Sequence, residues 1–214
     1  MKNKYITLIF ILIELALFPF AVFIFPNNRI PQYSAVVIAF IYSIYMSFKK
    51  DDQLIITIAL FNTLIADLFI LLLEKYIEVG MIFFIITQLV YFFLVFKNEN
   101  KTKAIIHLSV LGVLLIGSIT GVLLILKDNV NMIIIESCIY GSLLLTNMAF
   151  SFTNFKLFKT VSIGLLLFVF CDLGVAYGFL KDMGLVYSEF ISSLPFNYVW
   201  IFYLPSQALI SLNK

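Results

Sequence analysis

Long, nearly uncharged apolar runs constrain the fold of this chain more than any motif. Of its 214 residues, 63% are hydrophobic and 12% are charged, whereas soluble domains are about 45 to 50% apolar and about 25% charged. A transmembrane helix needs about 20 mostly apolar residues. The chain divides into about eight such stretches with short polar breaks, which predicts an integral membrane protein.

The runs are continuous rather than alternating, and they exceed the roughly 9 to 11 residues of a membrane barrel strand. We therefore expect an all-α, polytopic bundle of about eight transmembrane helices that forms a single integral membrane domain over residues 1–214. The second span is the shortest and is at the edge of what can cross. The expected spans are Tyr5–Phe25, Tyr33–Phe48, Leu54–Leu73, Val79–Phe96, Ala104–Leu126, Asn131–Thr153, Thr160–Leu180 and Leu194–Leu212.

Basic residues are distributed unequally between the two sides of the predicted bundle. With eight spans both termini lie on one side, which has ten Lys residues, while the other side has four basic residues, Arg29, Lys75, Lys127 and Lys181. Short cytoplasmic loops carry an excess of Lys and Arg. The distribution predicts the cytoplasmic membrane with both termini cytoplasmic. The net charge of +2 comes from these loops, and we expect no nucleic-acid partner.

Two aspartates lie deep inside apolar runs, Asp67 in ALFNTLIADLFILLL and Asp172 in IGLLLFVFCDLGVAY. A charge at bilayer depth costs about 2.5 to 3.5 kcal/mol on insertion scales, and such residues mark functional sites. At about 1.5 Å per helical residue, Asp67 lies roughly 20 Å and Asp172 roughly 18 Å from the terminal side. If their helices are neighbours, the carboxyls meet across one cavity. Because no span contains Lys or Arg, such a pair would divide into one acid and one base.

Further polar residues reach similar depths and share helical faces. Gln88 and Tyr91 are three residues apart, and the pairs Glu136 with Tyr140 and Tyr203 with Gln207 are four apart, so each pair lies on one face. Asn62 precedes Asp67 and lines the same cavity or bonds to a neighbouring helix. The alternative interpretation for all of them is interhelical hydrogen bonding within the bundle.

The sequence predicts no metal site and no cofactor. His107 is the only histidine and is expected at a surface or interfacial position, while Cys138 and Cys171 fall inside spans and are predicted to be small apolar fillers. Small residues that predict close helix packing recur along the span of His107, at Gly112, Gly117 and Gly121.

Five segments together resemble the YhhN family, the lysoplasmalogenases. In chain order they are LFNTLIADLFILL, TQLVY, IYGSLLLTNM, GLLLFVFCDLGVA and YLPSQALIS, and they extend from about Ala59 onward. That family has eight spans, with Gly-Asp in the third, His-x-x-Tyr in the fourth, Ser-Asp in the seventh and Tyr-x-x-x-Gln in the eighth. Here Ala66 replaces the Gly, Cys171 replaces the Ser and Gln88 replaces the His.

The resemblance implies hydrolysis of the vinyl ether bond of a lysoplasmalogen, a lysophospholipid substrate drawn from the lipid bilayer. Asp67 and Asp172 would supply the acid and the base. Polar side chains would line the pocket or orient water and the lipid head: Asn62, Gln88, Tyr91, Glu136, Tyr140, Tyr203 and Gln207.

Two alternatives remain open. One is a proton-coupled transporter of a small molecule or lipid, because intramembrane acids also serve proton relays and because the third and seventh spans resemble a parallel repeat. The other is a family member that binds a lipid without catalysis. Transporters tend to have broken helices at the site, whereas the spans of Asp67 and Asp172 contain no Pro, which favours a fixed pocket.

Overall fold

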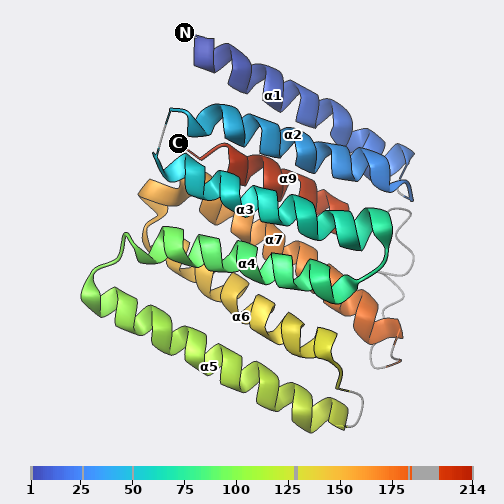
Figure 1. The fold of residues 1–214 in the computed structure, drawn as a ribbon, viewed down its shortest axis with the longest axis vertical. Coiled ribbons are helices and arrows are strands. Elements are labelled where there is room, and N and C mark those ends of the chain that lie inside the picture. The colour runs from blue at the N-terminus through green and yellow to red at the C-terminus, as the bar shows by residue number, and fades with distance from the viewer. Residues whose placement is uncertain are drawn as a thin grey trace.

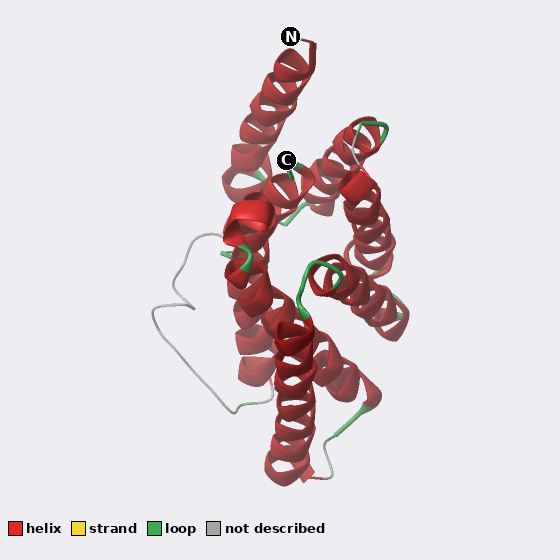
Figure 2. Cartoon of the chain, turned by 90° about the vertical axis from the view of Figure 1, so that its left-hand side faces the viewer, coloured by secondary structure: helices red, strands yellow, loops and turns green. Residues whose placement is uncertain are grey.

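The protein is a bundle of helices, and the connections that lie wholly within its described residues are short (Figures 1 and 2). The computed structural model describes residues 2–25, 27–49, 51–127, 130–182, 184 and 198–213, and no strand occurs among them. The α-helices are α1 (Lys2–Pro19), α2 (Arg29–Ser47), α3 (Asp51–Asp67), α4 (Ile77–Phe96), α5 (Lys101–Leu126), α6 (Met132–Thr153), α7 (Phe155–Asp182) and α9 (Val199–Ser211). Two π-helical segments, η1 (Phe20–Ile24) and η2 (Leu68–Leu73), extend α1 and α3.

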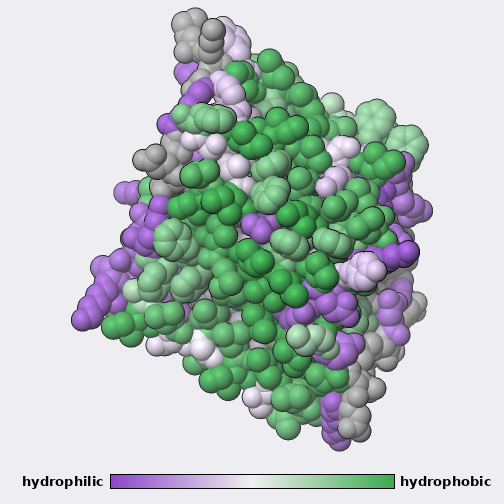
Figure 3. All heavy atoms as spheres, in the orientation of Figure 1, coloured by the Kyte–Doolittle hydropathy of each residue, from purple (hydrophilic) through white to green (hydrophobic). Residues whose placement is uncertain are grey.

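The surface carries the apolar band that a bilayer requires. Figure 3 shows hydrophobic side chains across the middle of the molecule and hydrophilic ones at its two edges. In the described part of the chain, seven helices are long and apolar enough to cross a membrane. Large apolar side chains point outward from them; Val113 and Ile116, for example, are each 71% exposed. The predicted all-α, polytopic membrane fold is confirmed.

Both termini lie at the same edge of the bundle, here called the terminal edge (Figure 1). At the opposite edge, called the distal edge, lie the connections that follow η1, η2 and α5, near Asn28, Lys75 and Lys127. This arrangement is the one expected for an even number of crossings. The start of α2 and the end of η2 therefore both lie at the distal edge.

Helix boundaries differ from the predicted spans at several ends; α7, for example, begins at Phe155 rather than at Thr160. The second helix has 19 residues rather than the short predicted stretch, because the Asn28 side chain accepts a hydrogen bond from the Ile30 amide and starts α2 at Arg29. The last described helix, α9, has 13 residues, and the first part of its predicted span lies outside the described residues. Most of the predicted surface segment 181–193 lies outside them as well.

The short helix α9 lies inside the bundle, where it contacts several other helices. It packs against α7, α2 and α3. A Cβ atom on Gly164 of α7 would lie 2.6 Å from Ile210 Cγ1 and 3.0 Å from the Ser206 carbonyl oxygen, so α7 and α9 approach closely only because this residue has no side chain.

The outermost helix, α5, packs against α6. The close packing predicted for its glycines is wrong, since added Cβ atoms there would meet nothing within 4 Å, at Gly112, Gly117 or Gly121.

Both π-helical segments interrupt an apolar span. The first follows Pro19, which cannot donate a backbone hydrogen bond and disturbs the turn before it. The second begins directly after Asp67 and contains no Pro. The uniform α-helix expected around Asp67 is therefore not observed, and the irregularity falls next to a candidate catalytic residue.

Candidate active site

Asp67 is the last residue of α3, where the α-helix passes into η2. Its side chain is 2% exposed, and the Tyr203 hydroxyl of α9 donates a hydrogen bond of 2.5 Å to its Oδ2 atom. Irregular π segments inside helices occur often at functional sites. The change in backbone geometry thus falls at a buried carboxyl that a second helix holds in place.

Asp172 lies within α7 and is partly exposed. The Tyr140 hydroxyl of α6 donates a hydrogen bond of 2.6 Å to its Oδ2 atom. The preceding residue, Cys171, is 3% exposed and belongs to the hydrophobic core, as expected for a small apolar filler. Each of the two aspartates receives a phenol hydroxyl from a different helix.

An aromatic ring joins the two tyrosines. The Phe168 centroid lies 6.4 Å from that of Tyr140 and 5.4 Å from that of Tyr203, both in edge-to-face arrangements. In addition, Asp67 acts electrostatically on Tyr140, and α9 contacts both aspartate-bearing helices. We call these four predicted residues the tyrosine–aspartate site: Asp67, Asp172, Tyr140 and Tyr203.

The described hydrogen-bond partners of the two carboxyls are tyrosine hydroxyl groups rather than cations. Placing a carboxylate out of water without a cation is costly. A carboxyl in such a setting is able to hold a proton and to pass it to a ligand, and its tyrosine fixes which oxygen faces the protein. The site has the groups needed for general acid and base chemistry.

Gln88 and Tyr91 are fully buried in α4. The Asn147 side-chain amide of α6 donates to Gln88 Oε1 at 3.1 Å and to the Gln88 backbone oxygen at 2.8 Å. Gln88 Nε2 and the Tyr91 hydroxyl have no hydrogen-bond partner among the described residues. The structure thus ties Gln88 to α6, and it leaves two buried donors on one face of α4.

The remaining predicted residues lie in the interior, where no described hydrogen bond joins them to either aspartate. The Asn62 side-chain amide donates a hydrogen bond to the Ile58 carbonyl of its own helix at 2.8 Å, so this donor has a partner within α3. Glu136 is 4% exposed near the start of α6, and Gln207 is 1% exposed in α9. Within the described part of the chain, Glu136 Oε2 and both amide atoms of Gln207 lack a partner.

Three aromatic residues near the site did not emerge from the sequence. Phe168 precedes Asp172 by four residues and so shares its helical face, which was an available signal. Tyr33 donates to the Leu64 carbonyl at 3.4 Å and lies within the electrostatic reach of Asp67. Tyr198 donates to the Gly174 carbonyl at 3.1 Å. Tyr33 and Tyr198 carried no spacing signal, because helix packing alone brings them there.

His107 occupies a different region, close to the terminal edge. It was predicted at a surface or interfacial position, and the surface alternative is wrong, because the side chain is fully buried. Its Nδ1 atom lies 3.1 Å from both carboxylate oxygens of Glu99, and its ring stacks on Phe150 with a centroid distance of 4.0 Å. The described residues include no group of three or more His, Cys, Asp or Glu side chains that could hold a metal ion.

Comparison with known proteins gives one match. The family model of the YhhN family matches residues 28–213, which include every residue of the tyrosine–aspartate site. No curated protein and no solved structure matches significantly.

Proposed function

Because the chain belongs to the YhhN family, we propose that it is a membrane hydrolase that cleaves the vinyl ether bond of a lysoplasmalogen. The observation that supports this most is the tyrosine–aspartate site, in which two carboxyls at bilayer depth each accept a hydrogen bond from a tyrosine of another helix. Vinyl ether hydrolysis needs one proton donor and one group that activates water. The products are a fatty aldehyde and a glycerophospho-alcohol.

The difference in exposure supports one division of the two roles. Asp67 is nearly inaccessible, and Tyr203 binds its Oδ2 atom, so in this scheme Oδ1 carries the acidic proton. That proton passes to the alkene carbon that does not carry the ether oxygen. The other alkene carbon, which is bonded to the ether oxygen, becomes the carbon of an oxocarbenium ion. Asp172 is less buried than Asp67, and in this scheme it is the group that contacts water. As a carboxylate it takes a proton from water while the water oxygen attacks this carbon, and the resulting hemiacetal collapses to aldehyde and alcohol.

The test measures aldehyde release from an alkenyl lysophospholipid by the purified protein. We expect release by the parent protein and a fall of at least about 100-fold, the order of general acid or base catalysis, for Asp67→Asn and for Asp172→Asn. Glu14→Gln is the matched control, because Glu14 is a membrane-embedded carboxyl in α1, outside the site. No aldehyde from the folded parent protein would refute the proposal.

A proton-coupled transporter is the second candidate, and one observation favours it. The helix that carries Asp67 changes to π geometry at that residue, and irregular helices at midplane acids are common in transporters. Proteoliposomes loaded with a pH-sensitive dye separate the two functions. Lysolipid-dependent proton movement without aldehyde formation would support transport, whereas aldehyde formation without it supports hydrolysis.

A further inference from the structure

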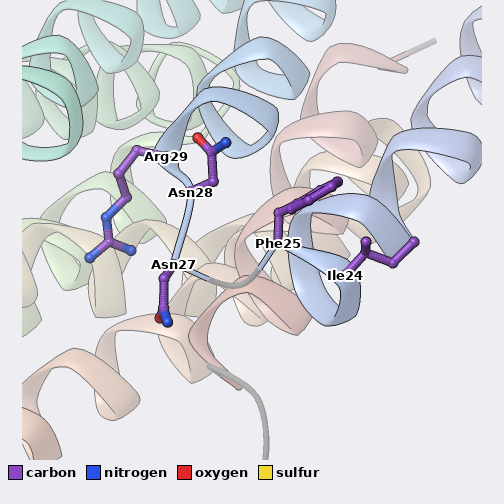
Figure 4. A pocket seen from close by; sticks show the side chains of 5 residues that line it. All are labelled: Ile24, Phe25, Asn27, Asn28 and Arg29. Carbon is purple, nitrogen blue, oxygen red and sulfur yellow. The ribbon is translucent and has the colours of Figure 1, made fainter.

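A hollow of about 490 Å³ opens at the distal edge, where η1 leads into α2. Ile24, Phe25, Asn27, Asn28 and Arg29 line it. Figure 4 shows Asn27 and Arg29 extending away from Phe25 and Ile24, so the hollow has a polar side and an apolar side. A surface of this kind suits an amphiphile whose polar group lies at the edge of a bilayer.

Arg29 is available to an anion at this hollow. Its side chain is 37% exposed, and its contact with the exposed Glu74 carboxylate is long, at 4.0 Å. Exposed ion pairs of this kind contribute little. The planar guanidinium group has five N–H donors whose fork matches a phosphate. The positive end of α2, a helix of 19 residues, adds to the attraction for an anion.

Trp200 supports Arg29 from beside the hollow, although it is not one of the residues that line it. The guanidinium lies 5.9 Å from the centroid of the Trp200 ring, and this side chain is 4% exposed. Its indole N–H is buried and has no acceptor in the described part of the chain. A buried indole N–H usually has an acceptor.

Trp200 also connects the hollow with the tyrosine–aspartate site. Its ring lies 5.7 Å from that of Tyr203 in an edge-to-face arrangement, and Tyr203 bonds to Asp67. Only the six residues of η2 separate Asp67 from Glu74, which corresponds to a depth of about 9 Å at helical rise. In a lysophospholipid, the phosphate and the first chain bond are separated only by glycerol, a distance of the same order.

We propose that Arg29 and Asn27 bind the phosphate of a lysophospholipid at the distal edge, with Trp200 packed against the guanidinium and the first bond of the lipid chain directed toward Asp67. The inference names the substrate class of the same site and in that respect rests on the proposed function. The apolar side chains of Ile24 and Phe25 beside the polar ones favour a lipid phosphate over a free one.

The test measures binding of a radiolabelled 1-O-alkyl lysophosphocholine, which lacks the alkene and cannot be hydrolysed, to the purified protein. An uncharged 1-O-alkylglycerol of the same chain length serves as the comparison ligand. We expect Arg29→Gln to weaken binding of the phospholipid about ten-fold or more, the loss typical of a charge-assisted hydrogen bond, and to leave the alkylglycerol unaffected. Lys127→Gln is the matched control, an exposed basic residue at the same edge.

Glu74→Gln is a second variant that keeps Arg29 in place. It removes the competing carboxylate, so we expect tighter phospholipid binding. Unchanged or weaker binding in this variant would contradict the proposal, as would equal losses of both lipids in Arg29→Gln. Inorganic phosphate is expected not to displace the lipid at equal concentration, and displacement by it would overturn the assignment to a lipid head group.

The outcome is separable from that of the hydrolase proposal, because the alkyl ligand reports binding without reaction. Binding that depends on Arg29 in a protein that releases no aldehyde would refute the hydrolase alone. If Arg29→Gln changed neither the rate of aldehyde release nor the affinity for the phospholipid, the phosphate site alone would be refuted.

Discussion

Tyr203 and Asp67 are 136 positions apart in the sequence, yet the hydroxyl of one donates to the carboxyl of the other at 2.5 Å inside the bundle. The bond joins α9 to the residue at which α3 becomes irregular. It therefore combines two roles, since it satisfies a buried acceptor and orients a proposed acid. The two roles make different contributions to stability and to activity.

Tyr203→Phe removes this donor while keeping the ring. We expect the free energy of unfolding to fall by about 1 to 3 kcal/mol because a buried acceptor loses its partner. Aldehyde release should fall further, by about 10-fold or more, because the acid loses its orientation. Tyr42→Phe is the control, since it removes another interhelical hydroxyl contact, to Thr7 at 2.9 Å, far from the site in the sequence. Equal activity losses in the two variants would argue against a role for Tyr203 in orienting Asp67.

Gly164→Ala tests the close approach of α7 and α9. The added Cβ would lie 3.0 Å from the Ser206 carbonyl oxygen and 2.6 Å from Ile210 Cγ1, so α9 must shift. We expect a loss of about 1 to 3 kcal/mol of stability, typical of overpacking. Because α9 carries Tyr203, aldehyde release should fall as well.

Gly178→Ala on the same helix is the matched control. An added Cβ there meets nothing within 4 Å, so thermal unfolding should change little or occur at a slightly higher temperature, as Ala is the better helix former. Similar destabilisation in both glycine variants would contradict the packing explanation.

The fold could be predicted from the sequence because its main determinant is local. Apolar runs of bilayer length leave the helix as the only open-chain solution, since every backbone polar group must be bonded within the segment. The start of α2 was missed because a single side chain, Asn28, extends the helix beyond the apolar run. The prediction of close helix packing at the glycines of α5 was wrong because a pattern of small residues does not reveal whether a partner helix lies against them.

The candidate site was partly predictable for the same reason. Buried carboxyls such as Asp67 and Asp172 are conspicuous in apolar runs. Which tyrosine meets which aspartate depends on packing between helices distant in sequence, and no spacing rule reports it. The π geometry after Asp67 was also inaccessible, since the usual marker of an irregular helix, a Pro residue, is missing from η2.

Gln88 and Asn147 allow a test of whether a predicted site residue is structural. Their side chains bond at 3.1 Å between α4 and α6. In a double-mutant cycle with Gln88→Leu and Asn147→Leu, we expect a coupling energy of about 0.5 to 1.7 kcal/mol in thermal unfolding, the range found for interhelical hydrogen bonds in membranes. If Gln88→Leu abolished aldehyde release without lowering stability, its role would be in the reaction rather than in helix packing.

The loop charges predict the orientation of the bundle in the membrane, and this prediction can be tested directly. The positive-inside rule predicts that the terminal edge faces the cytoplasm, so we expect a Cys at Lys127 to face outward and a Cys at Lys101 to face inward; both Lys side chains are exposed. In intact cells, a membrane-impermeant maleimide should label Lys127→Cys, and it should label Lys101→Cys only after permeabilisation. The parent protein gives the background, because Cys138 and Cys171 lie within membrane-spanning helices. The reverse labelling pattern would invert the topology and would place the Arg29 hollow at the cytoplasmic face, so that a lysolipid substrate would enter from the inner leaflet.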